Sequence, residues 1–257
     1  MEKWIVRPKD QPDAAVRLFC FPYAGAGATA FRNWSEELGQ AIEVCCVQLP
    51  GRESRWREQP ASSIGELIPR LMEGLAPWLD RPFAFYGHSL GARVAFEMAH
   101  ELRRIGACQP NQLLVGACPS PQSLWPWPPL RWLADDDFLD EIQFRYGGTP
   151  KQILAEPELR AALLPALRAD VTMMETLRHI ARVPLDCPIT AFGGTNDPMV
   201  EAEALQGWRE QTQGNFALHL VDGDHFFLQS RRQWLLSQIS TDLARFREPR
   251  RSIEAYV

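Results

Sequence analysis

The sequence predicts an α/β fold in which helices cover both faces of a mostly parallel sheet. Short apolar and β-branched runs alternate with longer amphipathic stretches, which is the pattern of parallel strands joined by helical crossovers. The length of 257 residues is compatible with one large domain, residues 1–257. One long segment without a strand pattern interrupts this alternation.

Six of the apolar runs are predicted as strands, because they are short and rich in β-branched or other apolar side chains. They cover residues 16–21, 42–48, 83–86, 112–118, 189–193 and 215–221.

Five amphipathic stretches between the strands are predicted as helices. The clearest begins at Leu90, where apolar side chains recur every three or four positions as far as Ile105 and so share one face. The five helices cover residues 28–38, 63–79, 90–105, 200–212 and 231–247.

Residues 119–184 interrupt the alternation, and we expect them to form a helical lid inserted into the domain rather than a second domain. The segment contains no convincing strand and opens with a proline- and tryptophan-rich run. A helix is predicted over 135–146, followed by two helices that Pro165 breaks or kinks. The pair Gly147-Gly148 and residues 125–129 are candidate hinges.

The composition argues against several kinds of partner. A net charge of −5, with basic residues spread along the chain, argues against nucleic acid. No apolar run approaches the ~18 residues that span a bilayer, and the N-terminus lacks a signal-peptide pattern, so we expect a cytoplasmic protein. The six cysteines form no C-x-x-C pair and the histidines show no metal-site spacing, so no metal, zinc in particular, is expected.

The run Gly87-His88-Ser89-Leu90-Gly91 is the only G-x-S-x-G in the chain. It follows a predicted strand and begins a predicted helix, which is the context of a nucleophile elbow. Its glycines let the strand and the helix approach closely around a strained serine, and the helix N-terminus offers N–H groups to an oxyanion. Motif and context therefore predict Ser89 as a nucleophile rather than as an ordinary turn residue.

A serine nucleophile needs a base, and His225 is the best placed of the five histidines. It follows a predicted strand in a glycine-containing loop near the C-terminus, where the chain order Ser…Asp…His of this arrangement places the base. His88 lies inside the elbow motif, and the other three histidines lie on predicted helices or within a strand.

Asp197 is predicted to orient His225. It follows the predicted strand 189–193, at the carboxyl edge where parallel sheets assemble their sites. Asp222 and Asp224 remain alternatives, although Asp224 adjoins the histidine and reaches its Nδ1 poorly. The run Asn-Asp-Pro is also favourable turn chemistry, so a purely structural Asp197 stays open.

A glycine-rich loop, FPYAGAG, follows the first predicted strand at residues 21–27. A backbone N–H of this loop can complete an oxyanion hole together with the N–H of Leu90. A phosphate-binding loop is excluded because no Gly-Lys-Ser/Thr follows.

With these residues identified, the sequence resembles the type II thioesterases of polyketide and nonribosomal peptide synthesis. The matching motifs are FPYAGAG, LPGRESR, PFAFYGHSLGA, YGGTPK, GTND and GDHFFL, in this order from about residue 18 to residue 228. The sequence is equally similar to the stand-alone thioesterase that releases medium-chain fatty acids from fatty acid synthase.

The resemblance implies an α/β-hydrolase fold with a mobile helical lid. The implied activity is hydrolysis of acyl groups from the phosphopantetheine arm of acyl or peptidyl carrier proteins, which clears stalled or misprimed units without a cofactor. The expected partners are a carrier protein and its acyl thioester, and the expected state is a monomer. The residues carried over are Ser89 as nucleophile, His225 as base, Asp197 as acid, and Ala24 and Leu90 as oxyanion N–H donors. Apart from the resemblance, we expect the lid to line the acyl pocket through Met173 or Met174.

Two features of the motifs leave roles open. Tyr23 stands where many relatives have histidine, which should matter little because the oxyanion hole uses the backbone there. Arg52 and Arg55 could contact the carrier or its pantetheine arm, or they could bond loop carbonyls, and the structural role is favoured.

Other functions could use the same residues. A carboxylesterase or acyltransferase would have the same triad, and only a comparison of thioesters with oxygen esters separates them. A thioesterase embedded in a synthase is less expected, because no carrier domain precedes Val16. A non-catalytic hydrolase-fold binding module would need none of the three triad residues.

Overall fold

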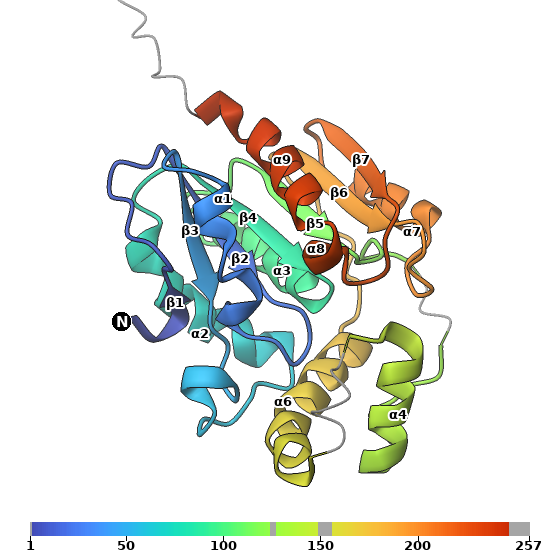
Figure 1. Cartoon of the computed structure of the whole chain (residues 1–257). Helices are drawn as coiled ribbons and strands as arrows, with labels where there is room; N and C mark the ends of the chain where they lie inside the picture. Colours follow the sequence, from blue (N-terminus) through green and yellow to red (C-terminus); the bar gives the residue numbers. More distant parts are fainter. Residues whose placement is uncertain (1, 124–126, 149–155, 247–257) are drawn as a thin grey trace, which may run out of the picture.

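Seven strands form the centre of the computed structural model, which describes residues 2–123, 127–148 and 156–246 (Figure 1). They are β1 (Ile5–Val6), β2 (Val16–Phe21), β3 (Ile42–Val47), β4 (Phe83–His88), β5 (Leu113–Gly116), β6 (Ile189–Gly194) and β7 (Phe216–Val221).

The strands make one sheet in the order β1-β3-β2-β4-β5-β6-β7. Every neighbouring pair is parallel except β1 and β3, which are antiparallel. The predicted mostly parallel α/β sheet is therefore confirmed, and all six predicted strands are present. The sequence pattern missed β1 because two residues are too few to show any periodicity.

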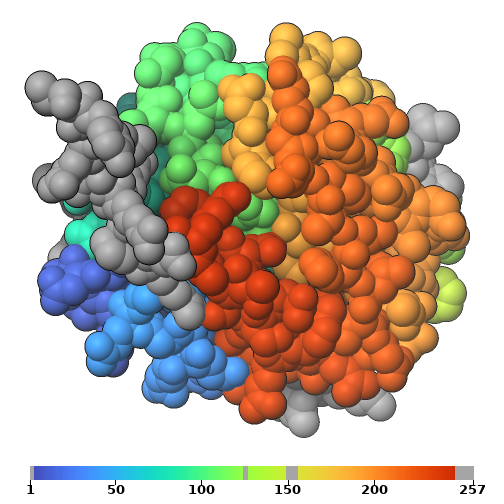
Figure 2. All heavy atoms as spheres, turned by 90° about the horizontal axis from the view of Figure 1, so that it is seen from above, coloured from blue at the N-terminus to red at the C-terminus, as the bar shows by residue number. Residues whose placement is uncertain are grey.

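Helices cover both faces of the sheet (Figure 1). On one face lie α2 (Ile64–Leu75), α3 (Leu90–Arg104) and α7 (Ala202–Gln206). On the other lie α1 (Trp34–Glu37), α8 (Phe227–Ser230) and α9 (Arg232–Asp242). Seen from above, the red C-terminal helices lie between the blue N-terminal segment and the orange β6–β7 region (Figure 2).

Alternating side chains of the strands divide the core into two layers, as the two-residue period of a strand requires. In β2, Phe19 and Phe21 belong to the buried cluster under α2 and α3. Leu18 and Cys20 belong to the cluster under α1 and α9.

Several predicted helices are shorter than expected. Residues 28–38, 200–212 and 231–247 each contain a short α-helix and a 3-10 helix instead of one long helix. Asn33 and Gly207 lie at two of these breaks, and both residue types favour helix ends over helix interiors. The 3-10 helices are η1 (Glu2–Trp4), η2 (Ala28–Phe31), η3 (Glu53–Arg55), η4 (Ala76–Trp78), η5 (Gly207–Gln211) and η6 (Ala244–Phe246).

The described residues of 119–184, which we call the insertion, contain helices and no strand. Helix α4 (Asp135–Tyr146) has the predicted bounds. Helix α6 (Pro157–Thr176) is continuous, so the break predicted at Pro165 is wrong. Pro165 is exposed, and the carbonyl that it leaves without a donor can bond to water instead.

Helices α4 and α6 of the insertion lie beside each other (Figure 1), and a small core of their own lies between them. Phe138 and Ile142 of α4 pack with Leu167 and Val171 of α6 in this third buried cluster. Part of the proposed hinge 125–129, namely residues 125 and 126, lies outside the described residues.

Ser89 forms a tight corner between β4 and α3. Its backbone has φ 52° and ψ −116°, in the left-handed region that costs a residue with a side chain about 1–3 kcal/mol. The two flanking glycines make the corner possible. A Cβ on Gly91 would lie 2.0 Å from the Phe21 carbonyl oxygen, and a Cβ on Gly87 would lie 2.2 Å from the Gly91 oxygen.

We predict that Gly91→Ala lowers the free energy of unfolding by about 3 kcal/mol or more, because the added methyl meets backbone that cannot move aside. Gly65→Ala in α2 is the matched control, since a Cβ there meets nothing within 4 Å. The control should leave stability unchanged or raise it by up to about 1 kcal/mol. Urea unfolding of both variants measures the difference, and equal stabilities would contradict the close packing at the corner.

Candidate active site

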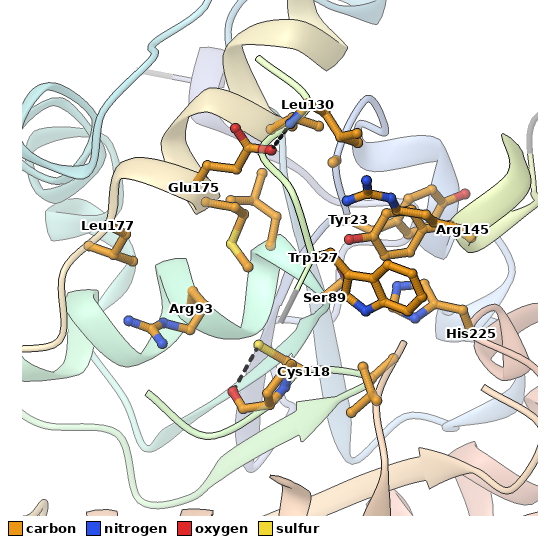
Figure 3. Close-up of a pocket in the computed structure, with 18 of the residues that line it drawn as sticks. Tyr23, Ser89, Arg93, Cys118, Trp127, Leu130, Arg145, Glu175, Leu177 and His225 are labelled. Carbon is orange, nitrogen blue, oxygen red and sulfur yellow. Dashed lines mark hydrogen bonds between the residues drawn. The ribbon is translucent and has the colours of Figure 1, made fainter. Parts of the chain in front are cut away.

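A cavity of about 620 Å³ lies where the strands end, and it collects the side chains that the sequence singled out (Figure 3). Ser89 follows β4, and His225 follows β7. Both line this cavity together with Ala24 and Leu90. The insertion supplies much of the remaining wall through α4 and α6.

His225 is held by the carboxylate of Asp197, whose Oδ2 lies 2.7 Å from the histidine Nδ1. The other carboxylate oxygen, Oδ1, accepts the Met199 N–H at 2.9 Å, so the acid is fixed in orientation. Because a carboxylate accepts, Nδ1 of His225 carries the proton and Nε2 is left with its lone pair. This is the tautomer in which a histidine can take a proton from a serine.

The two alternative acids have other partners. Asp222 accepts a hydrogen bond from Asn196 and pairs with Arg231. Asp224 accepts the Phe226 N–H, which stabilises the turn that carries His225. Of the three candidates, Asp197 is therefore the one that the structure brings to the histidine ring.

His88 fixes the other side of the same loop. Its Nε2 lies 2.8 Å from the His225 carbonyl oxygen, which can only accept, so Nε2 carries the proton. Its Nδ1 then accepts from the Tyr86 hydroxyl at 3.0 Å. Burial, with a smaller contribution from His225, lowers the pKa of His88 to about 3, so the ring is neutral. His88 thus positions the backbone of His225 and does not face the cavity.

The oxyanion donors expected from sequence lie at the cavity wall. Leu90 is the first residue of α3, so its N–H has no acceptor within the helix. Ala24 follows β2 in the loop 22–27, which we call the oxyanion loop, and it also lines the cavity. Cys118 lines the cavity too, but burial raises its pKa to about 12, so its thiol stays protonated.

Helix α6 touches the oxyanion loop directly. The carboxylate of Asp170, buried at 1% exposure, accepts the Gly25 N–H at 2.8 Å through Oδ2. The same oxygen pairs with the Arg52 guanidinium. Gly25 has φ 77°, and a Cβ on it would lie 3.2 Å from Leu167 of α6, so glycine allows this close approach. Burial raises the pKa of Asp170, against the effect of Arg52 and the Gly25 N–H.

The arginines of the LPGRESR motif have structural partners. Arg52 is buried and donates to the carbonyls of Pro50 and Ala166 in addition to its pair with Asp170. Arg55 is buried, donates to the Gln48 carbonyl and pairs with Glu58. Of the two roles left open by the sequence, these contacts support the structural one.

The two methionines expected in the acyl pocket point in different directions. Met174 lines the cavity. Met173 is 1% exposed in the core cluster beneath α2 and α3 and does not line it, so that expectation is wrong. Consecutive residues of a helix differ by about 100° in direction, and the sequence did not fix the rotation of α6.

Tyr146 was missed by the sequence reasoning. Its ring centroid lies 5.0 Å from that of His225, and its side chain lines the cavity at the end of α4. Burial raises the pKa of its hydroxyl, which therefore stays protonated. Its position at the end of α4, just before the Gly147-Gly148 pair, was the available signal.

Among the described residues, no three His, Cys, Asp or Glu side chains are grouped as a metal site. The same part of the chain contains no helix that is both long and apolar enough to cross a bilayer.

We predict that Asp170→Ala lowers the free energy of unfolding by about 3–5 kcal/mol, because it leaves the Arg52 charge buried without its partner. Hydrolytic turnover should fall as well, since the Gly25 N–H beside Ala24 loses its acceptor. Asp136→Ala is the control: it also breaks an ion pair to α6, with Arg160, but its side chain is 82% exposed and should contribute little. Losses no larger than those of the control would contradict the role of Asp170.

We predict that His88 makes the protein sensitive to acid. The ring has a pKa of about 3 when folded and about 6.5 when unfolded, so between these values only the unfolded chain binds the proton. Its stabilising contribution is complete above pH 6.5 and is lost as the pH falls towards 3, by up to about 1.4 kcal/mol per pH unit. Urea unfolding at several pH values should give a shallower slope for His88→Gln, and identical slopes would contradict this account.

Comparisons with known proteins agree with this geometry. The family model described as "Thioesterase domain" matches residues 16–243. The gramicidin S biosynthesis protein GrsT of Aneurinibacillus migulanus is 40% identical over 228 residues, which cover 89% of each chain.

Two solved structures have the same fold over nearly the whole chain. The RedJ thioesterase from the prodiginine biosynthetic pathway of Streptomyces coelicolor superposes with a TM-score of 0.84 at 37% identity, covering 93% of this chain and 90% of RedJ. The type II thioesterase BorB from the borrelidin biosynthetic cluster superposes with a TM-score of 0.83 at 32% identity, covering 95% of this chain and 97% of BorB. The chain therefore belongs to the thioesterase family, with an α/β-hydrolase fold and with type II thioesterases among its homologues.

Proposed function

We propose that this thioesterase removes acyl groups from the phosphopantetheine arm of acyl or peptidyl carrier proteins, with Ser89 as nucleophile and His225 as base. The observation that carries the proposal is the 2.7 Å contact between Asp197 and His225 at a cavity that Ser89 also lines. Relatives named for gramicidin S, prodiginine and borrelidin pathways support a role beside a peptide or polyketide synthase.

The first step is acyl transfer to the enzyme. Ser89 Oγ attacks the thioester carbonyl while Nε2 of His225 takes its proton, and Asp197 stabilises the imidazolium that forms. The N–H groups of Ala24 and Leu90 bind the oxyanion. The carbon–sulfur bond breaks, the imidazolium protonates the departing pantetheine thiolate, and the acyl group remains on Ser89.

The second step frees the enzyme. Nε2 of His225 takes a proton from water, and the resulting hydroxide attacks the acyl-Ser89 ester. The carbon–oxygen bond to Ser89 breaks, Oγ recovers its proton from His225, and the carboxylic acid leaves. No cofactor takes part in either step.

In this proposal residues 119–184 act as a lid within a single domain, residues 1–257. The insertion has its own small core and contributes α4 and α6 to the cavity wall. A carrier can remain outside while its thin pantetheine arm reaches Ser89 through the lid. A brief encounter of this kind suits an enzyme that must serve many carriers as a monomer.

Triad variants assayed on an acylated carrier protein test the proposal. Ser89→Ala should abolish turnover and leave the fold intact. Asp197→Asn should lower turnover by about 10⁴-fold, because the amide favours the wrong tautomer of His225. Asp222→Asn, which removes an exposed carboxylate near the same loop, should leave turnover close to that of the wild type.

The substrate class is tested by comparing thioesters and oxygen esters of one acyl chain. Faster hydrolysis of the carrier-bound thioester than of the same acyl group on N-acetylcysteamine supports carrier recognition. Equal rates with the carrier-bound and the N-acetylcysteamine thioester would make the protein a general thioesterase. Faster hydrolysis of the oxygen ester than of the thioester would make it a carboxylesterase. Near-normal turnover of Asp197→Asn would remove that residue from the mechanism.

A further inference from the structure

Arg93 brings a positive charge to the wall of the cavity that Ser89 also lines. It lies on α3, four residues after Ser89, so the two Cα atoms are about 6 Å apart along the helix. Its side chain lines the same cavity as Ser89 and is 8% exposed. Arg93 and Leu177 lie toward one side of the cavity and His225 toward the other in the close-up view (Figure 3).

Among the described residues the Arg93 guanidinium makes no hydrogen bond or ion pair, and its Nε is buried without a partner. The Glu97 carboxylate attracts it only through space, and Arg182 opposes that attraction. The nearby acids have other partners. Glu97, one turn further along α3, pairs with Arg182 at 2.8 Å. Glu175 accepts the Leu130 and Arg131 N–H groups, and the nearby Cys118 is a neutral thiol.

Two other arginines of the cavity wall have ion-pair partners, and a third, Arg178, is exposed to solvent. Arg131 pairs with Glu175 at 3.0 Å, and Arg145 pairs with Glu141 at 2.7 Å. Burial lowers the pKa of Arg93, yet a guanidinium remains charged at neutral pH. A buried charge without a partner is unfavourable, so the cavity wall at Arg93 is suited to an anion supplied from outside the chain.

We propose that Arg93 binds a carboxylate on the acyl chain, so that the enzyme acts preferentially on acyl thioesters whose far end is anionic. This inference rests on the proposed thioesterase function and names its substrate class. A guanidinium binds a carboxylate through two parallel hydrogen bonds, which adds orientation as well as affinity. The short separation from Ser89 favours chains in which the carboxylate is a few carbons from the thioester.

The phosphate of the pantetheine arm is the other source of the same anionic chemistry. It is separated from the thioester sulfur by the whole length of the arm, on the side away from the acyl group. Arg93 lies one helical turn from the residue that attacks the thioester, so the acyl carboxylate is the source that this position favours.

The test uses N-acetylcysteamine thioesters, which carry no phosphate. Succinyl, glutaryl and adipoyl thioesters are compared with butanoyl, pentanoyl and hexanoyl thioesters of the same lengths. The wild type should give a higher kcat/KM with at least one of the acids than with its neutral match. Arg93→Met should lower this acid-to-neutral ratio at least 10-fold, and Arg93→Lys should retain part of it. Arg104→Met, which removes an exposed arginine from the same helix, should leave the ratio unchanged.

The possible outcomes distinguish failure of the proposed thioesterase function from failure of the proposed role of Arg93. If the wild type hydrolyses no thioester of either series, the proposed function fails. If it hydrolyses the neutral series but the ratio is the same in Arg93→Met, only the inference is overturned. If Arg93→Met slows the hydrolysis of butanoyl-phosphopantetheine more than that of butanoyl-pantetheine, Arg93 binds the phosphate of the arm. That result also overturns the proposal that Arg93 binds an acyl-chain carboxylate. Removing an unpaired buried charge should keep or raise Tm, so a folded Arg93→Met protein is expected, and a lowered Tm would assign Arg93 a structural role.

Discussion

The close contact between α3 and the end of β2 is the constraint on which the site depends. Because Gly91 has no side chain, the start of α3 lies against the Phe21 carbonyl, and Ser89 is forced into its left-handed backbone conformation. This single contact sets the position of the Ser89 side chain and the Leu90 N–H, and it brings the oxyanion loop after β2 close to both. The proposed nucleophile and the Leu90 N–H are therefore positioned by backbone packing, whereas the loop that carries Ala24 is also held by the Asp170 side chain.

The proposed base, His225, is positioned by side chains of other residues rather than by close backbone packing. Tyr86 and His88 lie on β4, and their hydrogen-bonded side chains end at the carbonyl of His225. The ring of His225 is held separately, by Asp197 after β6. The main chain of the proposed base is thus held from strand β4, and its ring is held from the loop that follows β6.

The sequence was sufficient for the features that depend on local pattern. Strand β2 and helix α4 have the predicted bounds, and the order Ser89, Asp197, His225 along the chain indicated the pair of Asp197 and His225 and the cavity that His225 shares with Ser89. The sequence was insufficient for the features that tertiary contacts determine. The continuity of α6 past Pro165 depends on exposure, and the direction of Met173 depends on helix rotation. The pair between Arg52 and Asp170 joins residues that are 118 positions apart, and no local pattern connects them.

The bond from Asp170 to Gly25 has a consequence for how such enzymes diverge. The insertion lines the cavity beside Ser89, whereas the oxyanion loop follows strand β2, yet one carboxylate joins the two. In a chimera whose insertion comes from a relative with a different acyl preference, Gly25 and Arg52 would contact whatever residue that relative has in place of Asp170. An exchanged insertion therefore has to supply an acceptor that fits both Gly25 and Arg52, because one oxygen of Asp170 serves both.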